Sequence, residues 1–315
     1  MVAVLSLSAC SEDEDTSNNE TTGSNDSSST SDGDSPTNTD RPEPTMGLST
    51  QSLVHDNLTR EYDLYVPSSY DGSEAFPVLL NFHGGTGTSQ EQMYIADMRN
   101  LADEEGFLLI YPQAARESGE TNWNTLRSAE LSKLEADDFG FIEALIDSLA
   151  ANYVVDTSRV YATGYSNGAG FSYALACQLS DKIAAVAPVS GLMPIDASEY
   201  PCSPTHPTSI MIFNGTQDYE RPYSGIDGYL LSVDEAVSFW TGYNNLNDTA
   251  EMTTINDGGL TIERYAYSGG DGGVELRLYR VVGGGHYWFE FPDDGMAHNQ
   301  MIWNFLSRFN LDGQL

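Results

Sequence analysis

Ser166 is the residue of this sequence best suited to covalent chemistry, because it lies at the centre of a Gly-Tyr-Ser-Asn-Gly pentapeptide at positions 164–168. A serine hydroxyl attacks a carbonyl carbon when a neighbouring base removes its proton. The Gly-x-Ser-x-Gly pattern is typical of a sharp strand-to-helix turn that exposes the serine above a sheet. The pattern also arises by chance, so it predicts a nucleophile only in that structural setting.

The residues on both sides of the pentapeptide have the required character. Arg159–Thr163 is β-branched and aromatic, and we expect it to be a strand that runs into Gly164. Asn167–Leu179 carries Ala, Phe, Tyr, Leu and Cys at helical spacing, and we expect it to be a helix. The order of strand, turn and helix therefore favours a nucleophilic serine over an ordinary turn.

A nucleophilic serine needs a base, and the base needs a carboxylate that orients it. In one known arrangement of such triads, the serine comes first in the sequence, the acid follows a late strand of the sheet and the histidine follows the last strand. Asp218 lies shortly after the apolar run Ile210–Phe213, and His286 follows Val281, Val282 and three glycines. We therefore predict that Ser166, Asp218 and His286 form a triad.

Three further residues remain alternatives for these roles. Glu220 and Asp227 are close enough in sequence to Asp218 to replace it as the acid. His298 also follows the serine, but it opens a predicted helix, where a solvated or capping role is expected.

A glycine-rich segment offers backbone amides near the predicted nucleophile. His83, Gly84 and Gly85 follow the apolar run Phe76–Phe82. Glycines allow backbone amides to come close to a substrate oxygen, so we predict an oxyanion hole formed by the amides of Gly85 and Asn167. A plain glycine-rich turn with a structural histidine is the alternative.

The pattern of strands and helices along the chain indicates how these residues are positioned. We expect strands at Glu61–Val66, Phe76–Phe82, Phe107–Tyr111, Arg159–Gly164, Ala184–Val189, Ser209–Asn214 and, as the last one, Leu276–Val282. We expect helices at Gln90–Glu105, Phe141–Tyr153, Asn167–Leu179, Val233–Tyr243 and Ala297–Phe309. This alternation predicts an α/β protein with a mostly parallel central sheet, helices on both faces and the reactive residues at the carboxyl ends of the strands.

Several segments together resemble a known family. They are Gly164–Gly168, Ala184–Gly191, Gly215–Asp218, Gly284–Trp288, the residues Ala176, Cys177, Leu179, Ser180 and Asp181, and the residues Asp137, Asp138, Gly140, Phe141 and Ile142. They are similar to the polyhydroxybutyrate depolymerase and feruloyl esterase group of secreted α/β-hydrolases. The resemblance covers positions 60–305 in scattered blocks, and it implies the α/β-hydrolase fold and ester hydrolysis through an acyl-enzyme. The chain departs from the group's pattern at Ala169, where glycine is expected, and at Gly85, where cysteine is common.

Aromatic residues are candidates for the walls of an acyl-binding site. Tyr165, Trp288 and Trp123 have flat faces that suit a hydroxycinnamoyl group or an extended polyester, although each can equally pack in the core. Within the resemblance we favour hydroxycinnamoyl (feruloyl) esters of polysaccharide, with polyhydroxybutyrate or another polyester as the alternative. A serine peptidase and a non-catalytic surface-binding lipoprotein are the alternatives from other classes.

The first 45 residues differ in character from the remainder. Residues 1–10 are small and apolar and end in Leu-Ser-Ala-Cys, which resembles the lipobox of bacterial lipoproteins, in which the cysteine, here Cys10, is lipidated. No basic residue precedes Ser6, so we expect that the true start can lie upstream, and a frayed terminus of a cytosolic protein remains the alternative. Residues 11–45 are polar and acidic and predict a disordered tether, followed by a catalytic domain over 46–315.

This N-terminal reading implies where the protein works. We expect export, as an outer-membrane lipoprotein or an extracellular protein, with membrane contact only through a lipid anchor. The partner expected there is an ester substrate borne on a polymer.

The charge of the chain excludes one class of partner. The formal net charge is −34, and the lysines are Lys133 and Lys182. Phosphate binding needs clustered basic residues, so we expect no nucleic-acid partner. The acidity is also a feature of proteins from saline habitats, where salt screens self-repulsion, and simple solubility is the alternative explanation.

Cys177 and Cys202 remain once Cys10 is assigned to the lipobox. An even pair in an exported protein suggests a disulfide, with two buried free thiols as the alternative. The spacing of Cys and His predicts neither a metal site nor a cofactor.

Overall fold

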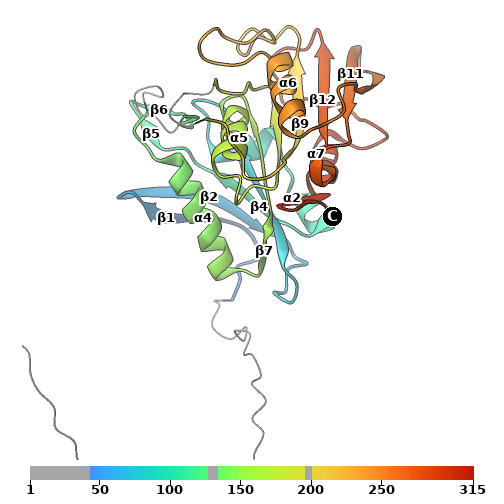
Figure 1. Cartoon of the computed structure of the whole chain (residues 1–315). Coiled ribbons are helices and arrows are strands. Elements are labelled where there is room, and N and C mark those ends of the chain that lie inside the picture. Colours follow the sequence, from blue (N-terminus) through green and yellow to red (C-terminus); the bar gives the residue numbers. More distant parts are fainter. Residues whose placement is uncertain (1–42, 127–133, 196–200) are drawn as a thin grey trace, which may run out of the picture. The chain divides into compact units, whose positions relative to one another are not determined.

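A ten-stranded sheet forms the centre of the protein (Figure 1). The structure is a computed structural model that describes residues 43–126, 134–195 and 201–315. The strands lie in the spatial order β1 (Gly47–His55), β2 (Leu58–Val66), β4 (Leu108–Pro112), β3 (Phe76–Phe82), β7 (Val155–Tyr165), β8 (Ala185–Val189), β9 (Ser209–Gly215), β12 (Leu276–Val282), β11 (Leu260–Tyr267) and β10 (Glu251–Asp257). The central strands from β4 to β12 in this order are parallel, and the pairings at both edges are antiparallel. The predicted mostly parallel central sheet is therefore confirmed.

The central strands are apolar because helices cover both of their faces. Every residue of β4, β8 and β9 is buried, as expected for parallel strands inside an α/β protein. Alternate residues of β9 enter two separate apolar clusters, Ile210 and Ile212 in one and Met211 and Phe213 in the other. The two clusters lie on opposite faces of the sheet.

The helices divide between these two clusters. Those that pack in the first cluster are α4 (Asp138–Asn152), α5 (Asn167–Gln178) and α6 (Val233–Tyr243). Those in the second are α1 (Ser89–Ile95), α2 (Arg99–Glu105) and α7 (His298–Leu306). The described residues also form a short 3₁₀ helix, η1 (Asp271–Gly273), and two small two-stranded sheets, one of β5 (Arg116–Glu117) and β6 (Glu120–Thr121), the other of β13 (Phe309–Asn310) and β14 (Gly313–Gln314).

Local sequence explains where two of the helices begin. The Asp137 side chain accepts a hydrogen bond from the Gly140 amide and caps α4. Ser232 and Glu235 form a reciprocal capping box at the start of α6. None of the helices in the described parts of the chain is long and apolar enough to cross a membrane.

The structure corrects several sequence-based expectations. The helix predicted over Gln90–Glu105 is divided into α1, which ends at Ile95, and α2, which begins at Arg99, and the Asp97 carboxylate between them accepts the Arg99 amide. The edge strand β1 and the hairpin of β10 and β11 were not predicted. The prediction that Leu276–Val282 is the last strand is wrong, because β13 and β14 follow it.

Two predictions lie outside the described residues. These are the lipoprotein-type segment with Cys10 and all but the last few residues of the tether over 11–45.

Candidate active site

Ser166 occupies a sharp turn between β7, which ends at Tyr165, and α5, which begins at Asn167. Its backbone has φ 55° and ψ −111°, a strained conformation that is typical of functional turns. Any Cβ at Gly164 would lie 2.7 Å from the Gly168 backbone, and one at Gly168 would collide with the carbonyl oxygen of Phe82. The glycines of the pentapeptide are therefore required for this turn, as the sequence indicated.

His286 and Asp218 lie on neighbouring loops at the carboxyl ends of β12 and β9. Nδ1 of His286 is 2.7 Å from Oδ2 of Asp218. The loops can approach because Gly215 has no side chain, since a Cβ there would collide with the Gly284 carbonyl. Backbone amides of Thr216 and Gln217 donate to carbonyls on the loop of His286 or the end of its strand, which fixes the two loops together.

The carboxylate of Asp218 is held in place by further donors. Its Oδ1 accepts the backbone amides of Glu220, at 2.9 Å, and Arg221, at 2.8 Å. Its other oxygen, Oδ2, is thereby directed at Nδ1 of His286. With Asp218 paired to Nδ1, the other ring nitrogen, Nε2, is the one available to act as a base.

The competing acids occupy other positions. Oε2 of Glu220 lies 3.8 Å from Nε2 of His286, on the side of the ring away from Asp218, and the Glu220 side chain is 71% exposed. Asp227 is also exposed. The structure thus brings Asp218, rather than either alternative, to Nδ1 of His286.

Tyr165 links the loop of His286 to the turn of Ser166. Its hydroxyl donates to the His286 carbonyl at 2.9 Å, and the two ring centroids are 4.9 Å apart. Burial raises the pKa of Tyr165 to about 12, so the phenol remains a donor. Tyr165, the residue before Ser166, therefore holds the histidine loop against the serine turn, and its part in an acyl-site wall stays a prediction.

The segment after β3 has an ordered histidine. Nδ1 of His83 is 2.7 Å from the Gly84 carbonyl, and Nε2 accepts the Ala114 amide at 3.1 Å. Burial lowers the pKa of His83 to about 4, so the ring is neutral and its proton resides on Nδ1. The Gly87 amide also donates to the Gly84 carbonyl, at 3.1 Å.

These contacts fix the direction of the Gly85 amide. Because a trans peptide is planar, the Gly85 N–H points opposite to the Gly84 carbonyl that His83 holds. The segment lies against the turn, since a Cβ at Gly84 would be 3.5 Å from Cβ of Ser166, and one at Gly85 would be 3.6 Å from Cβ of Asn167. The structure thus brings the two predicted amide donors into adjacent segments.

The position of Trp123 contradicts the prediction that this residue forms a wall of the acyl site. Its side chain is 1% exposed and stacks on Phe171, with centroids 5.0 Å apart and planes 8° apart. The Phe82 ring meets it edge-on at 5.1 Å. A ring enclosed in this way offers no face to a substrate, so the packing alternative is correct.

Trp288 and His298 share an aromatic cavity of about 460 Å³. The Trp288 indole is half-buried and donates to Asn299. Both ring nitrogens of His298 are buried without a hydrogen-bond partner among the described residues, and burial lowers its pKa to about 3. The His298 ring packs at 4.4 Å from Phe213, so it is a core residue rather than the base.

Cys177 on α5 forms a disulfide with Cys202, with the Cα atoms 4.5 Å apart. The bond ties the helix that follows Ser166 to the loop before β9. Among the described residues, no group of three or more His, Cys, Asp or Glu side chains is arranged to hold a metal ion.

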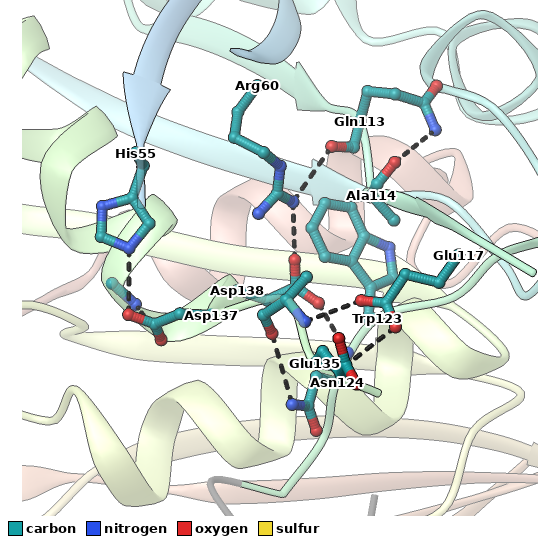
Figure 2. A network of polar contacts seen from close by, with 12 residues as sticks. His55, Arg60, Gln113, Ala114, Glu117, Trp123, Asn124, Glu135, Asp137 and Asp138 are labelled. Atoms are coloured by element: carbon teal, nitrogen blue, oxygen red, sulfur yellow. Dashed lines mark hydrogen bonds and ion pairs between the residues drawn. The ribbon is translucent and has the colours of Figure 1, made fainter. Parts of the chain in front are cut away.

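A buried ion pair was found only in the structure (Figure 2). The Arg60 guanidinium lies 2.6 Å from Oδ1 of Asp138, and both side chains are at most 2% exposed. The other carboxylate oxygen of Asp138 accepts the Asn124 amide at 2.7 Å. The sequence signal was the resemblance around Asp138 together with the Asn-Trp-Asn tripeptide at 122–124, which is too short to indicate a role by itself.

Comparison with known proteins agrees with this architecture. Residues 60–200 match the family model described as "Esterase PHB depolymerase". Feruloyl esterase B of Piromyces equi is 29% identical over 254 residues, which cover 78% of this chain and 44% of the relative. The bifunctional acetylxylan esterase/xylanase XynS20E of Neocallimastix patriciarum is 28% identical, and the match covers 81% of this chain and 34% of the relative. The chain thus spans less than half the length of these two curated relatives.

A solved structure has the same fold. The acetyl xylan esterase of Aspergillus awamori matches with a TM-score of 0.60 at 18% identity, covering 82% of this chain and 99% of that one. The covered parallel sheet and the serine turn after a central strand define an α/β-hydrolase. Within that fold, the chain is similar to the polyhydroxybutyrate depolymerase family model over residues 60–200 and to feruloyl esterase B.

Proposed function

We propose that the protein is a serine carboxylic-ester hydrolase that works through an acyl-enzyme. The observation that carries the proposal is the 2.7 Å contact between Nδ1 of His286 and Oδ2 of Asp218. The loop of His286 is in turn held by Tyr165, the residue before Ser166. In this geometry Nδ1 is occupied by the acid and Nε2 remains available for the serine proton.

The reaction has two halves. Nε2 of His286 takes the Ser166 proton while Oγ attacks the ester carbonyl, and the protonated ring then donates that proton to the leaving alcohol. Asp218 stabilises the imidazolium formed in between. Water, deprotonated by the same nitrogen, then attacks the acyl group and restores the serine, releasing a carboxylic acid.

The oxyanion of each tetrahedral intermediate needs donors that are already in place. The Asn167 amide is at the first position of α5 and has no partner within its helix. The Gly85 amide is directed by the contacts of His83 described above. We assign the oxyanion hole to these two amides, and losing one such donor typically costs about 2.7–4 kcal/mol of transition-state stabilisation.

The favoured substrates are hydroxycinnamoyl (feruloyl) esters carried by a polysaccharide. The similarity to a feruloyl esterase and to an acetylxylan esterase/xylanase supports this choice. A polyester such as polyhydroxybutyrate is the second candidate, because the matching family model is described as a polyhydroxybutyrate depolymerase. A serine peptidase and a non-catalytic binding lipoprotein have no comparable support.

The location of the enzyme follows from its N-terminal sequence. We propose export, with residues 1–10 as a signal segment, Cys10 as a lipidated residue and residues 11–45 as a tether to the catalytic domain. A tethered enzyme suits a polymer that is too large to enter the cell.

The Ser166→Ala variant tests the proposed chemistry. It should fold with an unchanged melting temperature and lose hydrolysis of p-nitrophenyl acetate, because the nucleophile is absent. Retained turnover by this variant would remove the proposal. Release of ferulate from feruloylated arabinoxylan, compared with release of 3-hydroxybutyrate from polyhydroxybutyrate by the wild type, decides between the two substrate classes.

A further inference from the structure

The two assigned oxyanion donors belong to segments that are far apart in the chain. Gly85 follows β3, and Asn167 begins α5. An oxyanion hole works only if both amides are preorganised at the correct spacing before the reaction. The structure therefore needs a device that holds the two segments together, and Trp123 contacts both.

Trp123 holds the Asn167 side chain at two points. The Trp123 amide donates to Oδ1 of Asn167 at 2.6 Å, and Nδ2 of Asn167 donates to the Trp123 carbonyl at 3.2 Å. Paired hydrogen bonds restrict the orientation of a planar amide group much more than one bond does. Because this side chain is short, the clamp also restrains the backbone amide of the same residue.

The indole of Trp123 reaches the other segment. Nε1 donates to the carbonyl oxygen of His83 at 3.0 Å. The next carbonyl along, that of Gly84, is the one that the His83 ring holds. We infer that Trp123 is a positioning residue that sets the spacing between the Gly85 and Asn167 oxyanion donors by hydrogen-bonding to both segments.

The residues around Trp123 give it the rigidity for this role. On one side, Thr121 accepts the Thr86 amide at 2.8 Å and donates its hydroxyl to the Gly87 carbonyl at 2.6 Å. On the other side, the Asn124 amide is held by the buried carboxylate of Asp138 (Figure 2). Residues 121–124 thus form a segment that lies against both oxyanion-donor segments and is held by hydrogen bonds at both of its ends.

The burial of Trp123 strengthens the hydrogen bond of its indole. The Trp123 ring is enclosed by Phe171 and Phe82, so water does not compete for its N–H. A hydrogen bond in such surroundings is stronger than one in water, and an unpaired carbonyl left behind is costly. Without the indole N–H, the buried His83 carbonyl lacks its donor, and the segment that carries Gly85 can shift until the carbonyl finds another one.

The inference rests on the proposed function, and the Trp123→Phe variant separates the two. This variant keeps an aromatic ring against Phe171 but lacks the N–H that binds His83. We expect kcat on p-nitrophenyl acetate to fall roughly tenfold with little change in KM, because the lost interaction acts on the transition state. Inhibition by phenylboronic acid, which forms a tetrahedral adduct, should weaken by a similar factor.

Trp240→Phe is the matched control. Trp240 is fully buried on α6, and its indole N–H has no hydrogen-bond partner among the described residues. This change removes the same atoms from the core, so it should lower the melting temperature comparably while leaving kcat and boronate inhibition near the wild-type values.

Asn167→Ala is a second route if Trp123→Phe does not fold. It keeps the Asn167 backbone amide and removes both arms of the clamp, and it should show the same fall in kcat with an unchanged KM. Wild-type kcat and boronate affinity in Trp123→Phe, or in Asn167→Ala where the first variant does not fold, overturn the inference while the proposed function stands. A wild-type protein that neither hydrolyses esters nor binds the boronate would instead defeat the proposed function.

Discussion

Loss of the Cys177–Cys202 disulfide should lower the stability of the catalytic domain by a predictable amount. The bond closes a loop with a sequence separation of 25. The chain-entropy relation gives about 3.5 kcal/mol at 25 °C for a loop of this length, because the cross-link restricts the unfolded chain. At about 2–4 °C per kcal/mol for domains of 150–250 residues, the loss corresponds to roughly 7–14 °C in melting temperature.

The Cys177→Ala/Cys202→Ala double variant provides the test by thermal unfolding followed with circular dichroism at neutral pH. Addition of dithiothreitol to the wild type should reproduce the loss, whereas the same reductant should have no effect on the double variant. Ester hydrolysis at 20 °C should be retained, since the disulfide ties the far end of α5, rather than the turn of Ser166, to the loop before β9.

Two results would refute this reasoning. One is a fall in melting temperature of less than about 2 °C, which would mean that the cross-link does not restrict the unfolded chain as the loop-length argument requires. The other is alkylation of the peptides that carry Cys177 and Cys202 in denatured, unreduced protein, which would show that the thiols are free.

Two further predictions compare a buried group with an exposed counterpart. Asp218→Asn should lower kcat on p-nitrophenyl acetate by about 10⁴, because an amide cannot stabilise the imidazolium or hold its tautomer. Glu220→Gln should change kcat by no more than about threefold, and an equal loss in both would refute the assignment of the acid. Arg60→Met should cost about 3–5 kcal/mol in urea unfolding because it leaves the buried Asp138 carboxylate uncompensated. Arg99→Met breaks an exposed pair and should cost less than about 1 kcal/mol, and similar losses would contradict the burial argument.

The sequence predicted the central strands well because their signal is continuous. Every residue of β8 and β9 is buried, so each strand is an unbroken apolar run. β1 was missed because its residues alternate between half-buried and exposed positions at the sheet edge, and most of them are polar. The β10–β11 hairpin had a readable signal, the Asp-Gly-Gly turn at 257–259, but its strands are also largely polar.

The candidate site divides in the same way between local and distant information. The turn of Ser166 could be predicted because its two glycines, the serine and the flanking strand and helix are adjacent in sequence. The role of Trp123 could not be predicted, because the residues that bury it and bind it, Phe171 and Asn167, are far along the chain. Periodicity and motif carry no information on such contacts.

The enclosure of His298 gives the fold an intrinsic limit to its acid tolerance. Its pKa falls from 6.5 to about 3 on burial, so below pH 6.5 the unfolded chain takes up a proton that the folded chain refuses. Stability from this residue is therefore level above pH 6.5 and is lost as the pH falls from 6.5 towards 3, by about 2 kcal/mol at pH 5. Because this ring, on the first residue of α7, packs on Phe213 near the end of β9, the contact between the C-terminal helix and the sheet is where the acid-dependent loss of stability arises.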